Sequence, residues 1–535
     1  MSVAPKDSRR RCAPHAPGNS GSDISFQDTA ETPSVLFSGC VRHCNPLRSR
    51  IGEAAKRSLR VMKFGGTSLA DAFCVERVVE IVRVASRTSA LVVVVSAMAS
   101  VTNRLIEAGL QSEASNRKTV AAIFKDLRKQ HSAAINSLLH LPAARISIGR
   151  KMHHLFQEGE RFCGAIILER ELTPRMRDSI SSLGERLSAP LVAAALEARG
   201  VPTELIEATE LIVTDNVHGA AEPQGDATRE RCERRLRSLL QRGIVPVVTG
   251  FIGATPEGTV TTLGRGGSDY SATILGAALD ADEVIIWKDV DGVMTADPRI
   301  VPGARTVPEI SYREAAELAY FGAKVLHPKT LRAVVQPGIP VWVRNTFAPD
   351  RAGTKITPSG PLNGEAVTGL SAISDVALIT MGGPGIVGAS DILGRTFVTT
   401  AAVRADVLLI SQPSSQNEIC FVVSSAAAQR TVEALRREFA QELTREKVQD
   451  ITLNPGVAIV TAVGQKLRGM SGIVGRVFDA LARENVNVAA IAHSPSECNI
   501  SFVVAQKDVK AALVAIHREF QLGAPDRLTL SVASD

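Results

Sequence analysis

The stretch "VMKFGGTSLADA", Val61–Ala72, joins a short apolar run to a segment of helical pattern through two glycines. A strand that runs into a glycine turn and then a helix brings backbone N–H groups together at the helix N-terminus, and such a place binds anions. Lys63 adds a positive charge at the end of the strand. The lysine precedes the glycines, unlike in a Walker loop, and a Gly-Gly turn taken alone is more often only a turn.

Apolar runs and amphipathic helical segments alternate up to about residue 350. Apolar runs that lack alternating polar residues and are separated by helices are typical of a mostly parallel sheet covered on both faces. We therefore predict an α/β fold, an αβα sandwich, over residues 60–350. The expected strands are "LRVMKF", "ALVVVVSAM", "PTELIEA", "ELIVTD", "IVPVVTGFIGA", "DEVIIWKDV" and "IPVWVRN", and residues 116–170 are expected to be helical throughout.

The remainder of the chain contains an internal repeat. The turn-rich segment "DRAGTKITPSGPLNGEA" predicts a linker, which we place at residues 351–372. Beyond it, Gly394–Val423 aligns without gaps to Gly475–Val504, and each copy reads as glycine loop, helix, strand, turn and strand. The repeat predicts two small α+β modules, at residues 373–450 and 451–530.

Residues 1–59 are rich in Ser, Arg, Pro and Gly and lack periodicity, so we expect a disordered tail. The tail has no apolar segment typical of a secretion signal. Its Asp23, Asp28 and Glu31 fit a transit peptide poorly, because such peptides contain few acidic residues. The tail also holds most of the net charge of +6, and the nearly neutral remainder gives no general attraction to nucleic acid.

The eight cysteines are scattered along the chain, which indicates a reducing compartment and predicts a cytoplasmic protein. Cys40, His43 and Cys44 lie close enough to suggest a metal site. No strand or helix pattern surrounds them, so free residues in a loose tail are the better interpretation. No apolar run reaches the roughly 18 residues that a membrane span needs.

A second glycine cluster, "TVTTLGRGGSDYSAT" (Thr259–Thr273), again joins a strand to a helix. Arg265 carries a planar fork suited to gripping a carboxylate. Ser268 and Asp269 have plain interpretations as a helix cap and a first-turn acid. Neither plain interpretation explains the Arg-Gly-Gly that precedes them.

Two more clusters place further charges in the same domain. In "IIWKDVDGVMTADPR" (Ile285–Arg299) a strand ends in Lys288 and Asp289, and "FGAKVLHP" presents Lys324 at a helix end. Lysines, arginines and two glycine loops in one α/β domain predict a site for a triphosphate and an anionic substrate.

The motifs "KFGGTS", "LGRGGSDYSAT", "WKDVDGV", "ADPR" and "FGAKVLHP", in this order, resemble those of the aspartate kinase family, which has the amino-acid-kinase fold. The repeated modules resemble the ACT domains of the same family, so the resemblance covers about residues 60–530. It implies transfer of the γ-phosphoryl group of ATP to the β-carboxylate of L-aspartate, giving 4-phospho-L-aspartate, the first step of lysine, threonine and methionine biosynthesis. Mg²⁺ is then expected with its ligands mainly phosphate and water, and no protein metal ligand is predicted.

The resemblance also assigns roles to residues of this sequence. Lys63, Asp269 and Lys324 are expected at the reacting groups, with Asp269 orienting Lys63 or Arg265. The expected substrate contacts are Ser96, Thr102, Glu185, Arg265 and Ser268, in which Arg265 binds the α-carboxylate and Glu185 the ammonium group. The expected ATP contacts are Lys63, Gly65, Gly66, Ser68, Lys288, Asp289, Met294, Arg299 and Lys324. Without the resemblance, Glu185 would be interpreted as a surface-helix glutamate and Thr102 as a helix cap.

ACT-like modules imply control by an end-product amino acid and association into a homodimer or homotetramer. The resemblance places the effector at Ile386, Val387, Ser411 and Gln412, where a glycine loop faces a strand. The sequence around "LISQPSS" is more similar to the threonine-sensitive than to the lysine-sensitive branch, which predicts threonine inhibition. His493 departs from the glutamine that is frequent in that branch, and a structural role is its better interpretation. We expect a monofunctional kinase, because the sequence contains no GxGxxG motif after a strand.

Two other functions fit parts of the sequence. Another amino-acid kinase, such as a glutamate 5-kinase or an N-acetylglutamate kinase, would keep the fold and change the substrate, but the paired modules and "KFGGTS" argue against it. A non-catalytic amino-acid sensor would not need Lys63, Arg265 and Asp269, all of which are present.

Overall fold

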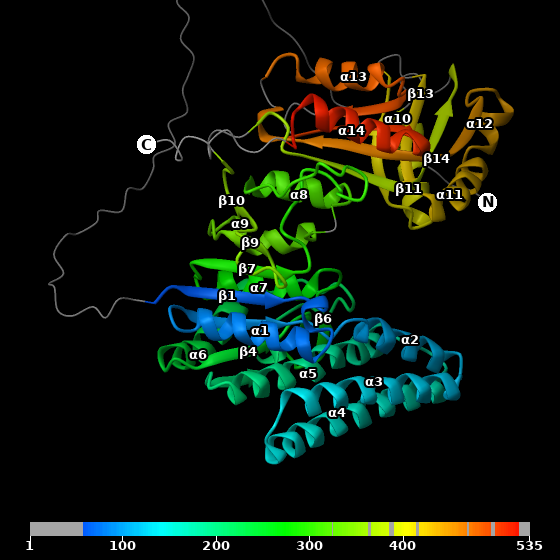
Figure 1. Ribbon diagram of the computed structural model, residues 1–535. Coiled ribbons are helices and arrows are strands. Elements are labelled where there is room, and N and C mark those ends of the chain that lie inside the picture. Colours follow the sequence, from blue (N-terminus) through cyan, green and yellow to red (C-terminus); the bar gives the residue numbers. More distant parts are fainter. Residues whose placement is uncertain are drawn as a thin grey trace, which may run out of the picture. The chain divides into compact units, whose positions relative to one another are not determined.

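The computed structural model describes residues 57–323, 325–361, 365–384, 390–413, 417–467, 470–493 and 498–523. Its first sheet has eight strands in the order β3-β4-β2-β1-β7-β9-β10-β8 (Figure 1). All neighbours in it run parallel except β9 and β10. The strands are β1 (Leu59–Phe64), β2 (Ala90–Val95), β3 (Thr203–Ile206), β4 (Val245–Thr249), β7 (Glu283–Lys288), β8 (Glu309–Ser311), β9 (Val341–Asn345) and β10 (Thr354–Thr357). The predicted mostly parallel sheet is confirmed.

Helices cover both faces of this sheet. On one face Val93 and Val95 of β2 pack into a core with residues of α1 (Ala72–Ala85) and α5 (Pro174–Ala198). On the other face Val92 and Val94 pack into a second core with α6 (Gly225–Gln241) and α7 (Gly267–Ala278). Because every residue of such a strand meets a core, the strand sequence shows no polar alternation.

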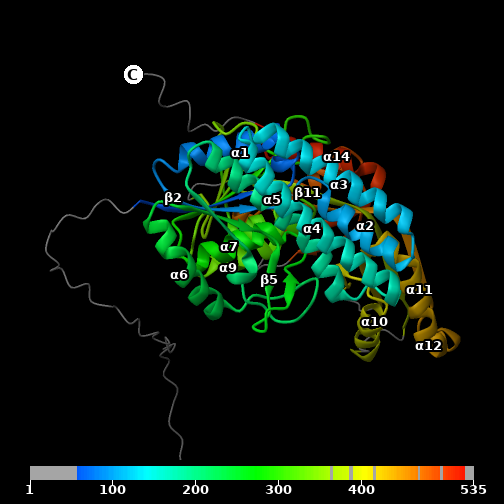
Figure 2. The same cartoon turned by 90° about the horizontal axis from the view of Figure 1, so that it is seen from below.

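Residues 116–170 are helical, as predicted, and form two helices. α3 (Arg117–Leu138) and α4 (Pro142–Glu169) are separated by a short break, and Pro142 occupies the first turn of α4, where a missing N–H costs nothing. They pack with α5 and with α2 (Val101–Glu113), and both views show the four helices together (Figures 1 and 2).

One strand prediction was wrong and another was wrong in part. "ELIVTD" contains no strand: a 3-10 turn, η2 (Ala208–Glu210), is followed by isolated bridges from Val213 to Ala254 and from Thr214 to Pro223. "IVPVVTGFIGA" is interrupted at Phe251, whose φ of 69° is incompatible with a continuous strand. Its second part is β5 (Ile252–Ala254), which forms a hairpin with β6 (Val260–Thr262).

The predicted linker at residues 351–372 is wrong in part. Thr354–Thr357 forms β10, which pairs antiparallel with β9 and parallel with β8. The sheet therefore extends beyond residue 350. Between β8 and β9 lie α8 (Tyr312–Tyr320), η3 (Pro328–Leu331) and α9 (Arg332–Val335).

The second sheet has six strands in the order β12-β13-β11-β14-β16-β15, all antiparallel. In the first copy of the repeat, α10 (Ser390–Ala402) leads to β12 (Val407–Ser411) and β13 (Glu418–Ser424). In the second copy, α13 (Ile473–Arg483) leads to β15 (Val488–His493) and β16 (Asn499–Ala505). The other elements are β11 (Gly369–Gly382), α11 (Ser425–Glu438), α12 (Ala440–Thr444), β14 (Asp450–Val463) and α14 (Val509–Glu519). The helix and the two strands predicted for each copy are confirmed, and the β11–β14 pairing joins the copies into one sheet.

No helix within the described ranges is long and apolar enough to cross a membrane.

Candidate active site

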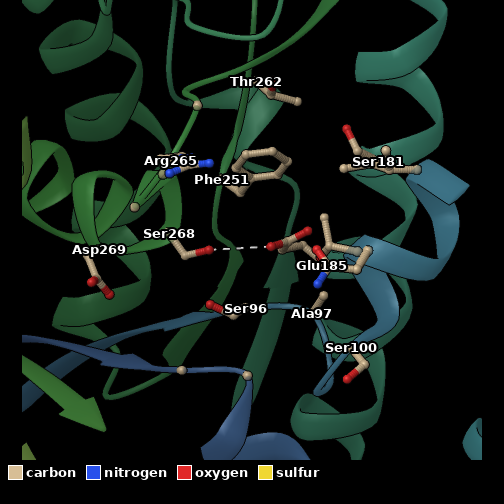
Figure 3. Close-up of a pocket in the computed structure, with 18 of the residues that line it drawn as sticks. Ser96, Ala97, Ser100, Ser181, Glu185, Phe251, Thr262, Arg265, Ser268 and Asp269 are labelled. Carbon is tan, nitrogen blue, oxygen red and sulfur yellow. Dashed lines mark hydrogen bonds between the residues drawn. The ribbon is translucent and has the colours of Figure 1, made fainter. Parts of the chain in front are cut away.

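A cavity of about 1130 Å³ lies at the carboxyl ends of β1, β2 and β7, between α5 and the first turn of α7 (Figure 3). In a parallel sheet these strand ends meet at one edge, which is where ligands of α/β proteins bind. The cavity brings together most of the residues that the sequence predicts for the site. They are Lys63, Gly65, Gly66, Ser96, Thr102, Glu185, Arg265, Ser268, Asp269, Lys288 and Asp289.

Asp269 forms the centre of the charge arrangement. Lys63 Nζ lies 2.5 Å from its Oδ1 and Lys288 Nζ lies 2.9 Å from its Oδ2. Lys63 and Lys288 come from adjacent parallel strands, and Asp269 from the first turn of α7, where the helix dipole favours an acid.

The pKa values at this centre follow from burial and charge. Burial alone would raise the pKa of Asp269, but the two lysines outweigh it and hold that pKa at about 2. Burial lowers the pKa of Lys63, and the charge of Asp269 opposes this effect. Asp269 is therefore a carboxylate at neutral pH, held between two amines.

Two of the glycines lie in close packing. A Cβ on Gly66 would lie 3.1 Å from the carbonyl oxygen of Ala97, so the loop after β1 lies directly against the loop after β2. Gly266 has a φ of 71°, and a Cβ there would lie 2.6 Å from His327 Cβ. The glycine between Arg265 and α7 thus allows the turn that starts the helix.

Glu185 is buried on α5, although a helix glutamate is usually exposed. Ser268 Oγ donates to its Oε1 at 3.3 Å, and its buried Oε2 accepts no hydrogen bond from a described residue. Burial raises the pKa of Glu185 to about 8. A buried carboxyl group with an unpartnered oxygen is suited to a cationic ligand group such as an ammonium.

Arg265 projects toward the same cavity from the glycine loop (Figure 3). Unlike the two lysines, it forms no ion pair with a carboxylate within the described part of the chain. A guanidinium without a protein carboxylate is available for an anionic ligand, and its fork suits a carboxylate.

Three of the described residues predicted for substrate or ATP do not line this cavity. Ser68 is fully buried and shares a 2.7 Å hydrogen bond with Thr346. Met294 receives a long 3.5 Å hydrogen bond from the Thr306 hydroxyl, and Arg299 is exposed and pairs with Asp297 at 2.6 Å. Lys324 lies outside the described residues.

Other lining residues were missed by sequence reasoning. They are Asp178, Ser181, His218, Phe251 and Thr262, among others. Asp178 and Ser181 had a usable signal, because they precede Glu185 at helical spacing and share its face of α5. His218 and Phe251 lie in loops without a local pattern.

A second cavity, of about 690 Å³, lies between α8 and the two edge strands β12 and β15. Ser411 and Gln412, two of the predicted effector contacts, line it together with His493. Ile386 and Val387, and the tail residues Cys40, His43 and Cys44, lie outside the described residues. Within the described ranges no group of three His, Cys, Asp or Glu residues is arranged to hold a metal ion.

Comparisons with known proteins show which family the chain belongs to. The amino acid kinase family model matches residues 58–345, and an ACT domain model matches residues 379–439 and 460–520. A bifunctional aspartokinase/homoserine dehydrogenase of Daucus carota is 34% identical, over 88% of this chain and 51% of its own. Aspartokinase 1 of Arabidopsis thaliana is 32% identical, over 86% and 80%.

Solved structures give the same relationship. Aspartokinase III of E. coli, in complex with aspartate and ADP, aligns with a TM-score of 0.72 and 29% identity, over 86% of this chain and 100% of its own. The same enzyme in complex with lysine and aspartate aligns with a TM-score of 0.72 and 30% identity. The chain spans about half the length of the bifunctional relatives it matches. The chain belongs to the amino acid kinase family and, within it, to the aspartokinases with C-terminal ACT domains.

Proposed function

We propose that the protein is an aspartate kinase that converts ATP and L-aspartate into ADP and 4-phospho-L-aspartate. The observation that carries the proposal is the grouping of Lys63, Lys288, Glu185 and Arg265 around one cavity, two of them held by Asp269. The aspartokinase III of E. coli, which aligns over its full length, was crystallised with aspartate and ADP.

The reaction sets an electrostatic problem. The nucleophile is a β-carboxylate, which is already ionised at neutral pH, so no general base is required. Catalysis must bring one anion to another and spread the charge of the transferring phosphoryl group. Lys63 and Lys288 supply positive charge, and the loop at Gly65 and Gly66 brings the backbone close to the same place.

The amino-acid substrate is held by groups of opposite charge. Arg265 binds its α-carboxylate, and Glu185, with Ser268 beside it, binds its ammonium group. Ser96 and Thr102 complete the pocket from the side of β2 and α2. The β-carboxylate is then directed toward Lys63.

The nucleotide occupies the side of Lys288 and Asp289. Ser68, Met294, Arg299 and Lys324 remain proposed contacts on this side, and Met294 and Arg299 require the nucleotide to extend beyond the cavity. Mg²⁺ accompanies the nucleotide with phosphate and water as its main ligands, as its hydration preference favours. Asp289 directly follows Lys288 and lines the cavity on this side, so it is the carboxylate that we propose to hold the ion or its water.

The test is an assay of ADP release with Mg²⁺, ATP and one of L-aspartate, L-glutamate or N-acetyl-L-glutamate. We expect turnover with aspartate and at most background with the other two. Turnover with glutamate or N-acetylglutamate alone would assign another amino-acid kinase. Absence of turnover with all three would favour the sensor.

We further propose that the ACT modules, at residues 373–450 and 451–530, bind threonine and join chains into a dimer or tetramer. The threonine assignment depends on the sequence around Ser411 and Gln412, which line the cavity beside α8. Inhibition of the assay by lysine and not by threonine would contradict it, and light scattering tests the assembly. A cytoplasmic location stays a prediction, since several relatives are chloroplastic.

A further inference from the structure

Asp178 near the start of α5 is a buried carboxylate that the proposed mechanism does not use. Its side chain is 2% exposed, and it accepts four hydrogen bonds. His218 Nδ1 lies 2.8 Å from Oδ2, and the backbone N–H groups of Gly219 and Thr262 donate to Oδ2 at 3.1 and 3.2 Å. The hydroxyl of Thr262 donates to Oδ1 at 2.6 Å.

These donors come from two different segments. His218 and Gly219 belong to the loop before α6, and Thr262 is the last residue of β6, directly before the Arg265 loop. The two segments also touch each other: Ala221 N donates to the carbonyl oxygen of Thr262 at 2.9 Å, and a Cβ on Gly264 would lie 2.9 Å from the carbonyl oxygen of Gly219. Asp178 therefore fastens both segments to α5.

The same helix carries Glu185. Asp178 and Glu185 are about two helical turns apart and so face the same side of α5. Asp178 binds Thr262 at one end of the Arg265 loop, and Glu185 binds Ser268 at the other end. Figure 3 shows this arrangement: Thr262 and Ser268 lie on either side of Arg265, opposite the helix with Ser181 and Glu185.

We propose that Asp178 is a positioning residue of the amino-acid pocket. It holds the Arg265 loop at a fixed distance from α5 and thereby sets the spacing between Arg265 and Glu185. This inference rests on the proposed function, in which those two residues bind the α-carboxylate and the ammonium group of one substrate. A change in their spacing would weaken binding of the amino acid and leave the nucleotide side, at Lys288 and Asp289, unaffected.

Only a carboxylate satisfies this position. Asn offers one acceptor oxygen and brings two N–H donors, so it would set a donor against one of the four donors present. Burial of a carboxylate costs free energy that these hydrogen bonds offset. If Asp178 only stabilised the fold, loss of one of these hydrogen bonds would change KM for both substrates or for neither. A positioning residue changes KM for aspartate alone.

The experiment uses the full chain and the matched pair Thr262→Val and Thr262→Ser. Valine keeps the shape and removes the hydroxyl, while serine keeps the hydroxyl. Loss of this charge-assisted bond is expected to raise KM for aspartate about 10-fold in Thr262→Val, with KM for ATP within about twofold of wild type. Thr262→Ser is expected to restore KM for aspartate to within about threefold.

Two more variants complete the series. Asp178→Asn is expected to raise KM for aspartate more than Thr262→Val does, and its melting temperature shows whether it folds. Asp280→Asn is the control. It removes an exposed carboxylate that pairs with Arg229 at 2.8 Å and does not line the cavity, and it is expected to leave both KM values unchanged.

The outcomes separate the two proposals. If wild type shows no phosphoryl transfer to aspartate, the proposed function fails and the inference fails with it. If wild type is active and Thr262→Val equals Thr262→Ser, or if both KM values rise together, the proposed function stands and the positioning role of Asp178 is overturned.

Discussion

Lys63 Nζ lies 2.5 Å from Asp269 Oδ1, although one residue lies near the end of β1 and the other in the first turn of α7. Both side chains are at most 7% exposed, so water screens the pair poorly. Lys288, on the adjacent strand β7, forms an ion pair with the other oxygen of Asp269. The Asp269 carboxylate thereby holds together two cations that would otherwise repel each other.

Lys63→Met should abolish most of the activity. The substitution removes a buried charge directed at the reacting groups, and we expect kcat to fall at least about 100-fold. Asp269→Asn should also lower kcat, and it should lower the melting temperature because the buried Lys63 and the partly buried Lys288 lose their counter-charge. The measurement is steady-state ADP release, with Lys355→Met on β10, outside the cavity, as a control expected to keep kcat. Equal activity of Lys63→Met and this control would contradict the mechanism.

Glu185 should make the stability of the protein depend on pH. Its pKa is raised to about 8 by burial, whereas an unfolded glutamate titrates near 4.3. Between these values the folded protein holds a proton that the unfolded chain has lost, so stability falls as pH rises from about 4.5 to 8. Glu185→Gln lacks this dependence. The melting temperature of the variant minus that of wild type should therefore increase as pH rises from 5.5 to 8.5.

The control for Glu185 is Glu230→Gln, an exposed glutamate of α6 that pairs with Arg234. The melting temperature of Glu230→Gln should stay close to that of wild type at each pH measured. Saturating aspartate should shrink the effect of Glu185→Gln, because an ammonium group favours the ionised carboxylate. The same temperature difference at every pH would show that Glu185 is not protonated in the free protein.

Arg265→Lys should weaken binding of the amino acid and spare the nucleotide. Lysine keeps the charge but loses the planar fork, so we expect KM for aspartate to rise about 10- to 100-fold while KM for ATP changes little. The matched control is Arg229→Lys, at an exposed arginine that pairs with Asp280. A rise in KM for ATP alone would move Arg265 to the nucleotide side.

The alternation of helices and apolar strands could be predicted because both faces of the sheet are buried. Val92 and Val93 enter different cores, so the sequence is uniformly apolar there. The glycine loops and their charged neighbours were also visible, because each follows a strand directly.

Other features depend on contacts between distant segments. Leu211, Ile212 and Val213 are as apolar as a strand, but they are buried in the loop after η2 and form only an isolated bridge. His218 reaches the cavity through its bond to Asp178, which no local pattern encodes. Thr354–Thr357 joins the sheet from a turn-rich segment because β8 and β9 offer it partners on both sides.

His517 should make the contact between α14 and the segment after β7 sensitive to acid. Its Nε2 lies 3.1 Å from Thr295 Oγ1, next to Met294 on the proposed nucleotide side. Burial lowers the pKa of His517, and the positive charge of Arg305 adds to this. The imidazole is thus harder to protonate in the folded protein than in the unfolded chain. Its contribution to stability is present above about pH 6.5 and is lost as pH falls below that value.

His517→Gln keeps an amide that can bond to Thr295 and cannot be protonated in this range. Its melting temperature should therefore fall less than that of wild type between pH 7.5 and 5.0. His493→Gln is the matched control, since His493 is an exposed histidine of β15 whose Nδ1 lies 3.0 Å from the carbonyl oxygen of Asn499. If His517→Gln loses as many degrees on acidification as wild type, the acid sensitivity originates elsewhere and the contact with Thr295 does not depend on a neutral imidazole.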